Sequence, residues 1–172
     1  MSQLRPFSLL IKPASADCNL KCEYCFYLDN HTLYPETRHH RMSDQILERV
    51  IATYMATGQP QYSFIWQGGE PMLMGMEFFQ KVTELQVKHA KKRSVICNAL
   101  QTNATLLTYE FVKHLKKYNF LVGVSLDGPA SIHNQYRKRI NGDGTHETVL
   151  QGIEILNRLQ VEFNILTLVS SA

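Results

Sequence analysis

Three cysteines, Cys18, Cys22 and Cys25, lie close together near the start of the chain. A short apolar run at residues 9–11 precedes them and predicts a buried strand, so the thiols should lie on the loop that follows it. Three thiolates this close in sequence can bind one face of an iron-sulfur cube and leave one iron without a protein ligand. The C-x3-C-x2-C spacing therefore predicts a four-iron four-sulfur cluster. Its open iron could bind a small molecule through an amine and a carboxylate.

Two other uses of these thiols stay open at this point. Structural zinc sites need four protein ligands, and the nearest histidines, His31, His39 and His40, lack the paired spacing of a zinc motif. Disulfides are more typical of small secreted chains than of a chain like this one. The short and odd-numbered cysteine motif favours the cluster over both alternatives.

Composition indicates a globular chain of about one domain, because the 172 residues are 44% hydrophobic and 19% charged. The net charge of +3 is small, and without a basic run mixed with aromatic residues we expect no nucleic-acid partner. Only four cysteines occur, and Cys97, outside the motif, is expected to be a small buried hydrophobe. Few cysteines, and no apolar stretch long enough for a signal peptide or a bilayer crossing, predict a cytoplasmic protein that does not associate with membranes.

Along the rest of the chain, the hydrophobic pattern alternates between strand and helix periods. Strands are predicted at residues 9–11, 62–66, 94–101, 120–126 and 161–169. Four helices are predicted between them, one starting near Met76 and the others with Ser43, Thr108 and Thr145 as N-caps. Irregular loops are expected at residues 29–41 and 133–144. This alternation implies an α/β fold with a parallel sheet, either open or curled into a barrel.

The residues of chemical interest follow the ends of four predicted strands. They are the three cysteines and the segments at residues 68–71, 101–103 and 125–128. In a parallel sheet the carboxyl ends of the strands share one edge, and ligands bind there. The sequence therefore predicts one site rather than several.

The segment Gly68-Gly69-Glu70-Pro71 directly follows a predicted strand. Two glycines allow backbone groups to approach a ligand closely, and Glu70 offers an acceptor for an ammonium group. Alone, such a segment is more often a plain turn. Next to the cysteine motif, it predicts an amine pocket for a ligand of the open iron such as S-adenosylmethionine.

These motifs resemble the radical S-adenosylmethionine (radical SAM) enzymes and, within them, the anaerobic sulfatase-maturating enzymes. The resemblance covers nearly all 172 residues and rests on segments at residues 8–14, 17–28, 66–71, 100–103, 120–129 and 133–137. It implies an incomplete (βα)6 partial TIM barrel with about five parallel strands and four helices. It also implies an oxidoreductase that oxidises a cysteine or serine of a sulfatase to formylglycine by radical chemistry.

The same resemblance assigns roles to particular positions. Cys18, Cys22 and Cys25 match the cluster ligands, and the positions that match cofactor contacts are Tyr24, Gly68, Gly69, Glu70, Ser125 and Arg137. In the family, backbone at Tyr24 reaches the adenine, Ser125 contacts the ribose, and Arg137 pairs with the carboxylate. Gln67 and Asn103 are expected to line the same cavity. Without the resemblance, Tyr24 could be a packing aromatic, Ser125 a strand-end cap and Arg137 an exposed charge.

The resemblance further implies that residues 1–172 are a truncated radical SAM core domain. The cysteine-rich, SPASM-type domain that holds two further clusters in the family is expected to be absent. The family's proposed proton acceptor is an aspartate in the part that would follow Ala172, so no catalytic residue is assigned here, and Asp127 does not take that role. The alternatives are another peptide-modifying radical SAM enzyme, or an inactive iron-sulfur or zinc-binding fragment. The implied partners are a sulfatase or another peptide, and an electron donor such as flavodoxin or ferredoxin.

Overall fold

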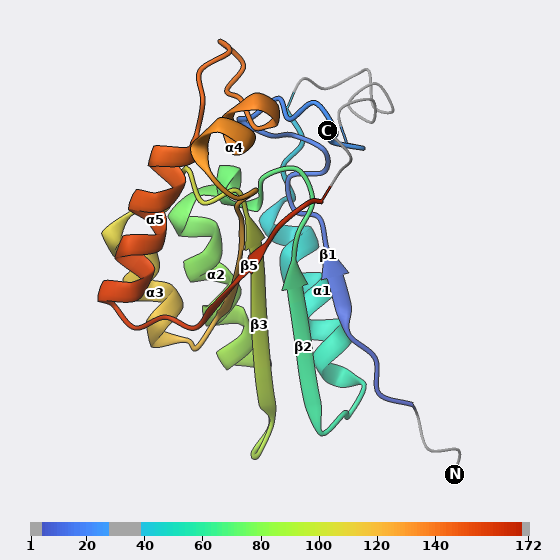
Figure 1. The fold of residues 1–172 in the computed structure, drawn as a ribbon. Coiled ribbons are helices and arrows are strands. Elements are labelled where there is room, and N and C mark those ends of the chain that lie inside the picture. The colour runs from blue at the N-terminus through green and yellow to red at the C-terminus, as the bar shows by residue number, and fades with distance from the viewer. Residues whose placement is uncertain (1–4, 28–38, 170–172) are drawn as a thin grey trace.

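Five parallel strands form the centre of the molecule. The computed structural model describes residues 5–27 and 39–169, and within them the strand order is β1-β2-β3-β4-β5. The strands are β1 Leu9–Ile11, β2 Gln61–Trp66, β3 Val95–Thr102, β4 Leu121–Ser125 and β5 Phe163–Leu166. Each strand pairs in parallel with the next one along the chain, so all crossovers step in the same direction. Among the described residues, β1 and β5 are the two open edges of this sheet (Figure 1).

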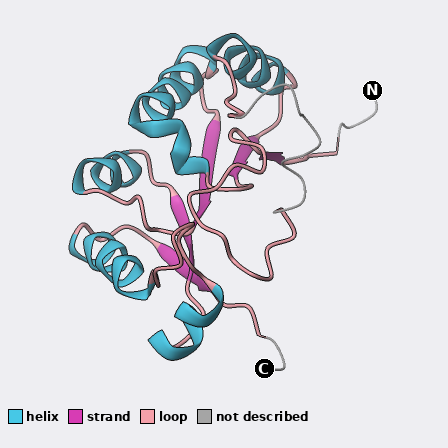
Figure 2. Cartoon of the chain, turned by 90° about the horizontal axis from the view of Figure 1, so that it is seen from above, coloured by secondary structure: helices cyan, strands magenta, loops and turns pink. Residues whose placement is uncertain are grey.

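Helices occupy the crossovers between the strands. They are α1 Asp44–Ala56, a short 3-10 helix at Pro71–Met74, α2 Gly75–His89, α3 Tyr109–Lys117, α4 Ala130–Tyr136 and α5 His146–Arg158. Figure 2 shows the helices in an arc on one side of the sheet. This arrangement confirms the predicted α/β fold and the incomplete barrel.

The helix-facing side of the sheet carries the hydrophobic core. Tyr62, Phe64 and Trp66 alternate along β2 and are at most 1% exposed. The Trp66 ring lies edge-on to Phe78 and Phe79 of α2, with centroid separations of 5.9 and 6.0 Å. Burial of such rings supplies much of the free energy that holds α2 against the sheet.

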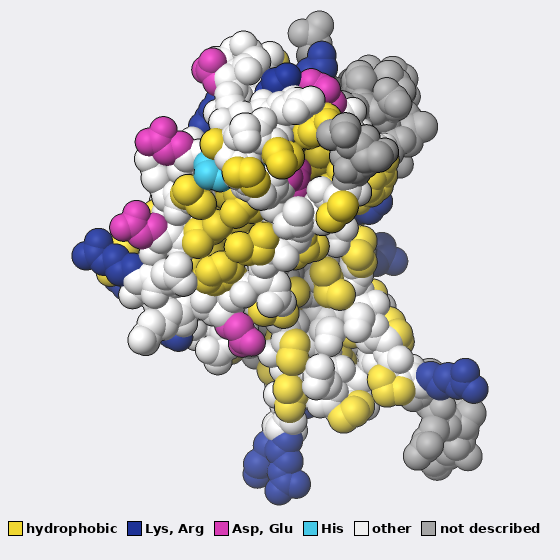
Figure 3. Space-filling model, in the orientation of Figure 1, with side chains coloured by type: hydrophobic (Ala, Val, Ile, Leu, Met, Phe, Trp, Pro, Cys, Tyr) yellow, Lys and Arg dark blue, Asp and Glu magenta, His cyan; other side chains and the backbone are white. Residues whose placement is uncertain are grey.

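The opposite, inner side of the sheet carries smaller and more polar residues. In β3 and β4 these include Gln101, Gly123 and Ser125, and Gln101 pairs directly with Gly123. The exposed large apolar residues of the strands and their continuations include Leu10, Leu121, Leu166 and Leu168. Figure 3 shows hydrophobic side chains gathered on the face seen in Figure 1, with the charged groups mainly at its margin.

One helix and one cap differ from the sequence prediction. The loop expected at residues 133–144 is wrong in its first part, because α4 extends to Tyr136. Thr145 stands at the N-cap position of α5, but its side chain makes no capping bond. Instead, Asn134 Oδ1 accepts hydrogen bonds from the backbone N–H groups of Thr145 (2.9 Å) and His146 (3.0 Å). A seven-residue helix is too short to show a clear period, and a cap from a distant residue leaves no local signal.

One predicted strand length and one predicted burial are also wrong. The strand expected at residues 161–169 is only four residues long, and β5 is largely exposed because it lies at the sheet edge. Cys97 is exposed rather than buried. It lies in the first part of β3, where β2 is paired but β4 is not. A parallel strand is buried on both faces only where layers cover both.

The other two predicted caps are confirmed. Ser43 and Thr108 each accept a hydrogen bond at 3.3 Å, from the N–H groups of Ile46 and Phe111. The loop predicted at residues 29–41 lies mostly outside the described residues. In the part of the chain that the structure describes, no helix is long and apolar enough to cross a membrane.

Candidate functional site

A cavity of about 200 Å³ lies at the carboxyl ends of the strands. Its wall is formed by residues from the cysteine loop and from the ends of β2, β3 and β4. The predicted site residues that line it are Cys18, Cys22, Tyr24, Cys25, Gly68, Gly69, Ser125 and Arg137. Gln67 and Asn103 line it as well, as expected. Of the residues to which the resemblance assigns cluster or cofactor contacts, Glu70 alone is not on the wall.

The cysteine loop, residues 18–25, is held from the far end of the chain. The Lys21 N–H donates to the carbonyl of Lys138 at 2.8 Å, and the Glu23 N–H donates to the carbonyl of Tyr136 at 3.0 Å. These bonds give a short antiparallel pairing between the loop and the segment that follows α4. The pairing places Arg137, between the two acceptors, beside the cysteines.

The four cysteines of the chain are free thiols. Burial raises the pKa of Cys18 to about 11, and burial also raises the pKa of Cys22. The Cys18 sulfur accepts a hydrogen bond from the Leu20 N–H (3.4 Å) and lies 3.7 Å from the side-chain nitrogen of Asn103. The nearby Arg137 opposes the shift at Cys22 but does not cancel it. Cys18 and Cys22 therefore stay protonated at neutral pH, and metal binding has to displace their protons.

The cysteines share a cavity wall rather than a tight cluster. Among the described residues, no three His, Cys, Asp or Glu side chains are close enough together to hold a single metal ion. Three thiolates bound to one zinc ion would lie about 4 Å from one another, given zinc–sulfur bonds of about 2.3 Å. The three cysteines are not arranged in this way here.

Gly68 and Gly69 are required by the protein's own packing. Their φ angles are +101° and +51°, in the region that favours glycine. A Cβ at Gly69 would lie 2.1 Å from the carbonyl oxygen of Asp17, and one at Gly68 would lie 2.7 Å from the Lys12 side chain. The glycine motif therefore packs directly on the chain that leads into the cysteine loop.

Asp17 directly precedes the cysteine loop, and its side chain anchors the backbone there. Its carboxylate accepts hydrogen bonds from the His40 N–H (2.7 Å) and from Arg41 Nη1 (2.6 Å). Burial opposes ionisation of Asp17, but the hydrogen bonds from His40 and Arg41 outweigh it and lower the pKa. The resulting charged carboxylate ties residues 40 and 41 to the base of the site.

Glu70 is completely buried beneath the cavity. Its carboxylate accepts hydrogen bonds from the Met72 N–H (3.0 Å), the Thr102 hydroxyl (2.8 Å) and the Asn103 N–H (2.7 Å). Burial raises its pKa, although these three bonds oppose the shift. Glu70 thus joins the glycine motif to the end of β3.

Arg137 enters the cavity wall with part of its hydrogen-bonding capacity unused. Its Nη1 donates to the Tyr24 hydroxyl at 2.7 Å and lies 3.9 Å from Asp127 Oδ2, while the Tyr24 hydroxyl donates to the same Asp127 oxygen. Its Nε is buried and has no hydrogen-bond partner within the described structure. Burial opposes its charge, but Cys22, Tyr24 and Asp127 outweigh that effect and raise the pKa of Arg137. A buried guanidinium with a free N–H suits a carboxylate ligand.

Ser125 is oriented by the neighbouring strand. Its hydroxyl accepts a hydrogen bond from Gln101 Nε2 at 3.1 Å. Gln101 lies across Gly123, where a Cβ would come within 2.0 Å of the Gln101 side-chain oxygen. A glycine inside a strand is a sequence signal for such a close approach, and it could have indicated that the Gln101 side chain lies over β4.

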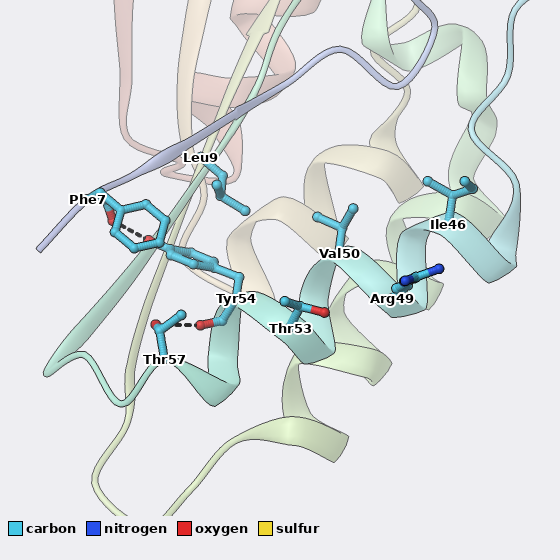
Figure 4. Close-up of a pocket in the computed structure, with 8 residues that line it drawn as sticks. All are labelled: Phe7, Leu9, Ile46, Arg49, Val50, Thr53, Tyr54 and Thr57. Atoms are coloured by element: carbon cyan, nitrogen blue, oxygen red, sulfur yellow. Dashed lines mark hydrogen bonds between the residues drawn. The ribbon is translucent and has the colours of Figure 1, made fainter. Parts of the chain in front are cut away.

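A larger cavity, about 500 Å³, lies between the first described residues and α1. Figure 4 shows its wall, which includes Phe7, Leu9, Val50 and Tyr54. The wall is almost entirely apolar, and no group of ligating side chains converges on it. Volume alone therefore does not identify the site, which is defined by the smaller cavity with thiols and a guanidinium.

The prediction of a single site is supported by this placement. It included Gln101 and Asp127, within the segments at residues 101–103 and 125–128, but gave neither a supporting role, and it missed His133. Asp127 bonds to Tyr24 and Gln101 bonds to Ser125, both of which line the cavity, and the buried His133 bonds to Asp127. None of the three belongs to the cysteine or glycine motif. Their bonds join segments that are distant in sequence or hidden inside a short helix. Apart from Gly123, no local pattern indicates them.

The fold and the site together define a partial-barrel α/β protein with a cysteine-lined cavity at the carboxyl ends of its strands. A family model described as the radical SAM superfamily matches residues 13–170. The chain therefore belongs to the radical SAM superfamily.

Relatives within the family are similar over nearly the whole chain. A cysteine-type anaerobic sulfatase-maturating enzyme of Clostridium perfringens is 46% identical over 170 residues, covering 96% of this chain and 45% of the relative. A serine-type enzyme of Bacteroides thetaiotaomicron is 43% identical over 167 residues, covering 96% of this chain and 40% of the relative. The chain thus spans less than half the length of these relatives.

Solved structures are similar to this chain as well. Native anSMEcpe with bound AdoMet and Cp18Cys peptide superposes with a TM-score of 0.87 at 46% identity, over 95% of this chain and 43% of that one. HydG, a maturase of the [FeFe]-hydrogenase, superposes with a TM-score of 0.62 at 15% identity, which shows a shared fold alone.

Proposed function

We propose that this chain binds a four-iron four-sulfur cluster through Cys18, Cys22 and Cys25, with S-adenosylmethionine beside it. The observation that carries the proposal is one cavity wall that combines three free thiols with a buried, partly unpaired Arg137. Three thiolates leave one iron open, and a guanidinium suits the carboxylate of the ligand. When bound, the reduced cluster and S-adenosylmethionine supply a carbon radical, chemistry that belongs to the cofactors.

The chain's own residues hold and orient these groups. The Leu20 N–H and the Asn103 amide lie against the Cys18 sulfur, and hydrogen bonds to cluster sulfurs raise the reduction potential. The Ser125 hydroxyl, oriented by Gln101, is available for the ribose. Glu70 keeps its carboxylate inside the protein, so we assign the amine contact to the backbone of Gly68 and Gly69 rather than to this side chain.

We further propose that this chain serves an enzyme that oxidises a cysteine or serine of a sulfatase to formylglycine. The support is the similarity to serine-type and cysteine-type sulfatase-maturating enzymes over nearly all of the chain. An electron donor such as flavodoxin or ferredoxin would reduce the cluster. Four free thiols suit a reducing compartment, and we propose the cytoplasm.

Anaerobic reconstitution tests the cluster. The wild type should bind about four irons and four sulfides per chain. Cys22→Ala should lose most of this iron, whereas Cys97→Ala, which removes an exposed thiol outside the cavity, should keep it. Stoichiometric zinc without sulfide, or unchanged iron in Cys22→Ala, would refute the cluster.

Binding of S-adenosylmethionine to the reconstituted chain tests the cofactor site. Arg137→Lys retains the charge but loses the planar fork, so the dissociation constant measured by calorimetry should rise about tenfold or more. Lys138→Ala is the control, because its ammonium bonds to Glu23 outside the cavity wall. Equal affinity in wild type and Arg137→Lys would remove Arg137 from the site.

A further inference from the structure

A buried chain of hydrogen bonds runs behind the cavity and includes a histidine that the proposed chemistry does not use. His133, in α4, is completely buried. Its Nδ1 accepts a hydrogen bond from the Asp127 N–H at 3.2 Å, and its Nε2 lies 3.0 Å from the Thr145 hydroxyl. The Thr145 hydroxyl in turn donates to the carbonyl of Arg137 at 2.8 Å.

The two end groups of this hydrogen-bond chain, the Asp127 N–H and the Arg137 carbonyl, fix the direction of every bond in it. The Asp127 N–H can only donate, so His133 Nδ1 carries no proton. The Arg137 carbonyl can only accept, so the single Thr145 proton points to it and the Thr145 oxygen accepts from His133 Nε2–H. His133 is therefore the neutral Nε2–H tautomer. Burial, followed by the charge of Arg137, lowers its pKa to about 4, in agreement with this assignment.

The two ends of this hydrogen-bond chain adjoin two different parts of the cavity wall. Asp127 follows Ser125 by two residues, just beyond the end of β4. Arg137 lines the cavity beside the cysteine loop. Their side chains are also joined through Tyr24, which bonds to both. The histidine chain therefore fixes the backbone at the same two points that the tyrosine joins through side chains.

We propose that His133, acting through Thr145, is a positioning residue for S-adenosylmethionine, an inference that rests on the proposed cofactor site. It holds the strand end that carries Ser125 and the backbone of Arg137 at one separation, so that both contacts are preorganised before the ligand arrives. In metal sites, replacing a residue that orients the ligating groups typically costs 10-fold to 100-fold in affinity, and we expect a loss of this order here. Preorganisation acts on affinity because the ordering cost is met during folding.

Matched variants separate this role from simple packing. Thr145→Val keeps the size of the side chain but removes the hydroxyl, and Thr145→Ser keeps the hydroxyl. His133→Asn can still accept from the Asp127 N–H but does not reach Thr145. His133→Gln can reach Thr145 but offers no acceptor at the Nδ1 position. Neither His133 nor Thr145 lines the cavity.

The experiment measures S-adenosylmethionine affinity by calorimetry on the reconstituted full chain, with iron content and melting temperature measured in parallel. Thr145→Val and His133→Asn should weaken affinity about tenfold or more at near-wild-type iron content, and Thr145→Ser should bind like the wild type. Wild-type affinity in Thr145→Val, or a loss that only tracks the loss of iron or of folded protein in all variants, would overturn the positioning role. Absence of binding by the wild type would instead overturn the proposed cofactor site.

A second measurement needs neither cluster nor ligand. Nitrogen-15 NMR of the metal-free chain, labelled at histidine, should show the His133 ring as the neutral Nε2–H tautomer at pH 7. Its signal, identified by its loss in His133→Gln, should keep this tautomer in Thr145→Ser. A charged ring or the Nδ1–H tautomer at pH 7 would overturn the inference directly.

Discussion

The two faces of the sheet are built by opposite rules. On the helix-facing side, Tyr62, Phe64 and Trp66 fill space and are buried against α1 and α2. On the inner side of the same strand, Ser63 and Ile65 are only partly buried. The helix-facing side chains are therefore large enough to fill the core, whereas the inner-face side chains are small enough to leave room for other groups.

Around the cavity the same contrast continues in β4. Val122 and Val124 are fully buried on the helix side, and Gly123 and Ser125 alternate with them on the inner side. Changes on the helix face should therefore act on stability. Changes on the inner face, and in the loops above it, should act on binding. The four predictions below test this division, from the largest effect on stability to the smallest.

Trp66→Ala should cause the largest loss, about 3–5 kcal/mol of unfolding free energy, because it removes a completely buried ring from the core. Ile65→Ala, one residue away on the inner face, is the control and should cost about 1 kcal/mol, since its side chain is already partly in water. Urea unfolding of the metal-free chain measures both. Equal losses would contradict the division between the two faces.

Acidification should destabilise the chain through His133. Its pKa is lowered to about 4 in the folded protein by burial and by Arg137, against about 6.5 when unfolded. The contribution of neutral His133 to the free energy of unfolding is fully present above pH 6.5. This contribution falls by up to about 3 kcal/mol as the pH falls towards 4. Besides Arg137, the charged or titratable groups that face the ring are Asp127 and His146.

The difference between the urea-unfolding curves of wild type and His133→Asn isolates this contribution, because the neighbouring groups remain in both. His114, whose pKa burial also lowers, contributes equally to the two proteins and cancels. A difference that does not change between pH 7 and pH 4 would show that His133 does not titrate as proposed.

Gly69→Ala should cost about 1–2 kcal/mol from its left-handed backbone alone, with a further cost from the collision with Asp17. Because the collision moves the entry to the cysteine loop, iron content and S-adenosylmethionine binding should both fall. Gly58→Ala is the matched control: its φ of +74° imposes similar strain, but a Cβ there meets nothing within 4 Å. Loss of iron in both variants would mean that strain, and not the contact, is responsible.

Gly123→Ala should have the smallest effect on stability, within about 0.5 kcal/mol, because the colliding atom is the end of the flexible Gln101 side chain. Displacing Gln101 removes its bond to Ser125, so S-adenosylmethionine affinity should fall several-fold. In a double-mutant cycle with Gln101→Ala the two losses should not add. Additive losses would show that Gly123→Ala does not weaken binding through Gln101.

Much of the fold could be predicted because its signals are local. The amphipathic pattern after Ser43, the cap itself and the run at residues 62–66 all act within a few residues, and α1 and β2 lie where they were expected. The three cysteines and two glycines were likewise recognisable by type and spacing. Their shared cavity wall followed from the rule for carboxyl ends of parallel strands.

The rest depends on contacts that no local pattern records. The capping of α5 by Asn134 and the bond between Asp127 and His133 join residues across turns and a short helix. The exposure of Cys97 depends on what covers the inner face, which strand propensity does not report. Glu70 was expected to meet the ligand, but its three internal bonds became visible only in three dimensions.

The pairing between the cysteine loop and the segment after α4 also has a consequence for the order of events during synthesis. Leu20 pairs with Arg139, which a ribosome adds about 120 residues later. At translation rates of about 5–20 residues per second, that delay is roughly 6–24 s. Throughout this interval the loop that carries the thiols lacks these native backbone partners. The cluster proposed for these thiols can therefore gain its native surroundings only after residues 136–139 have been made.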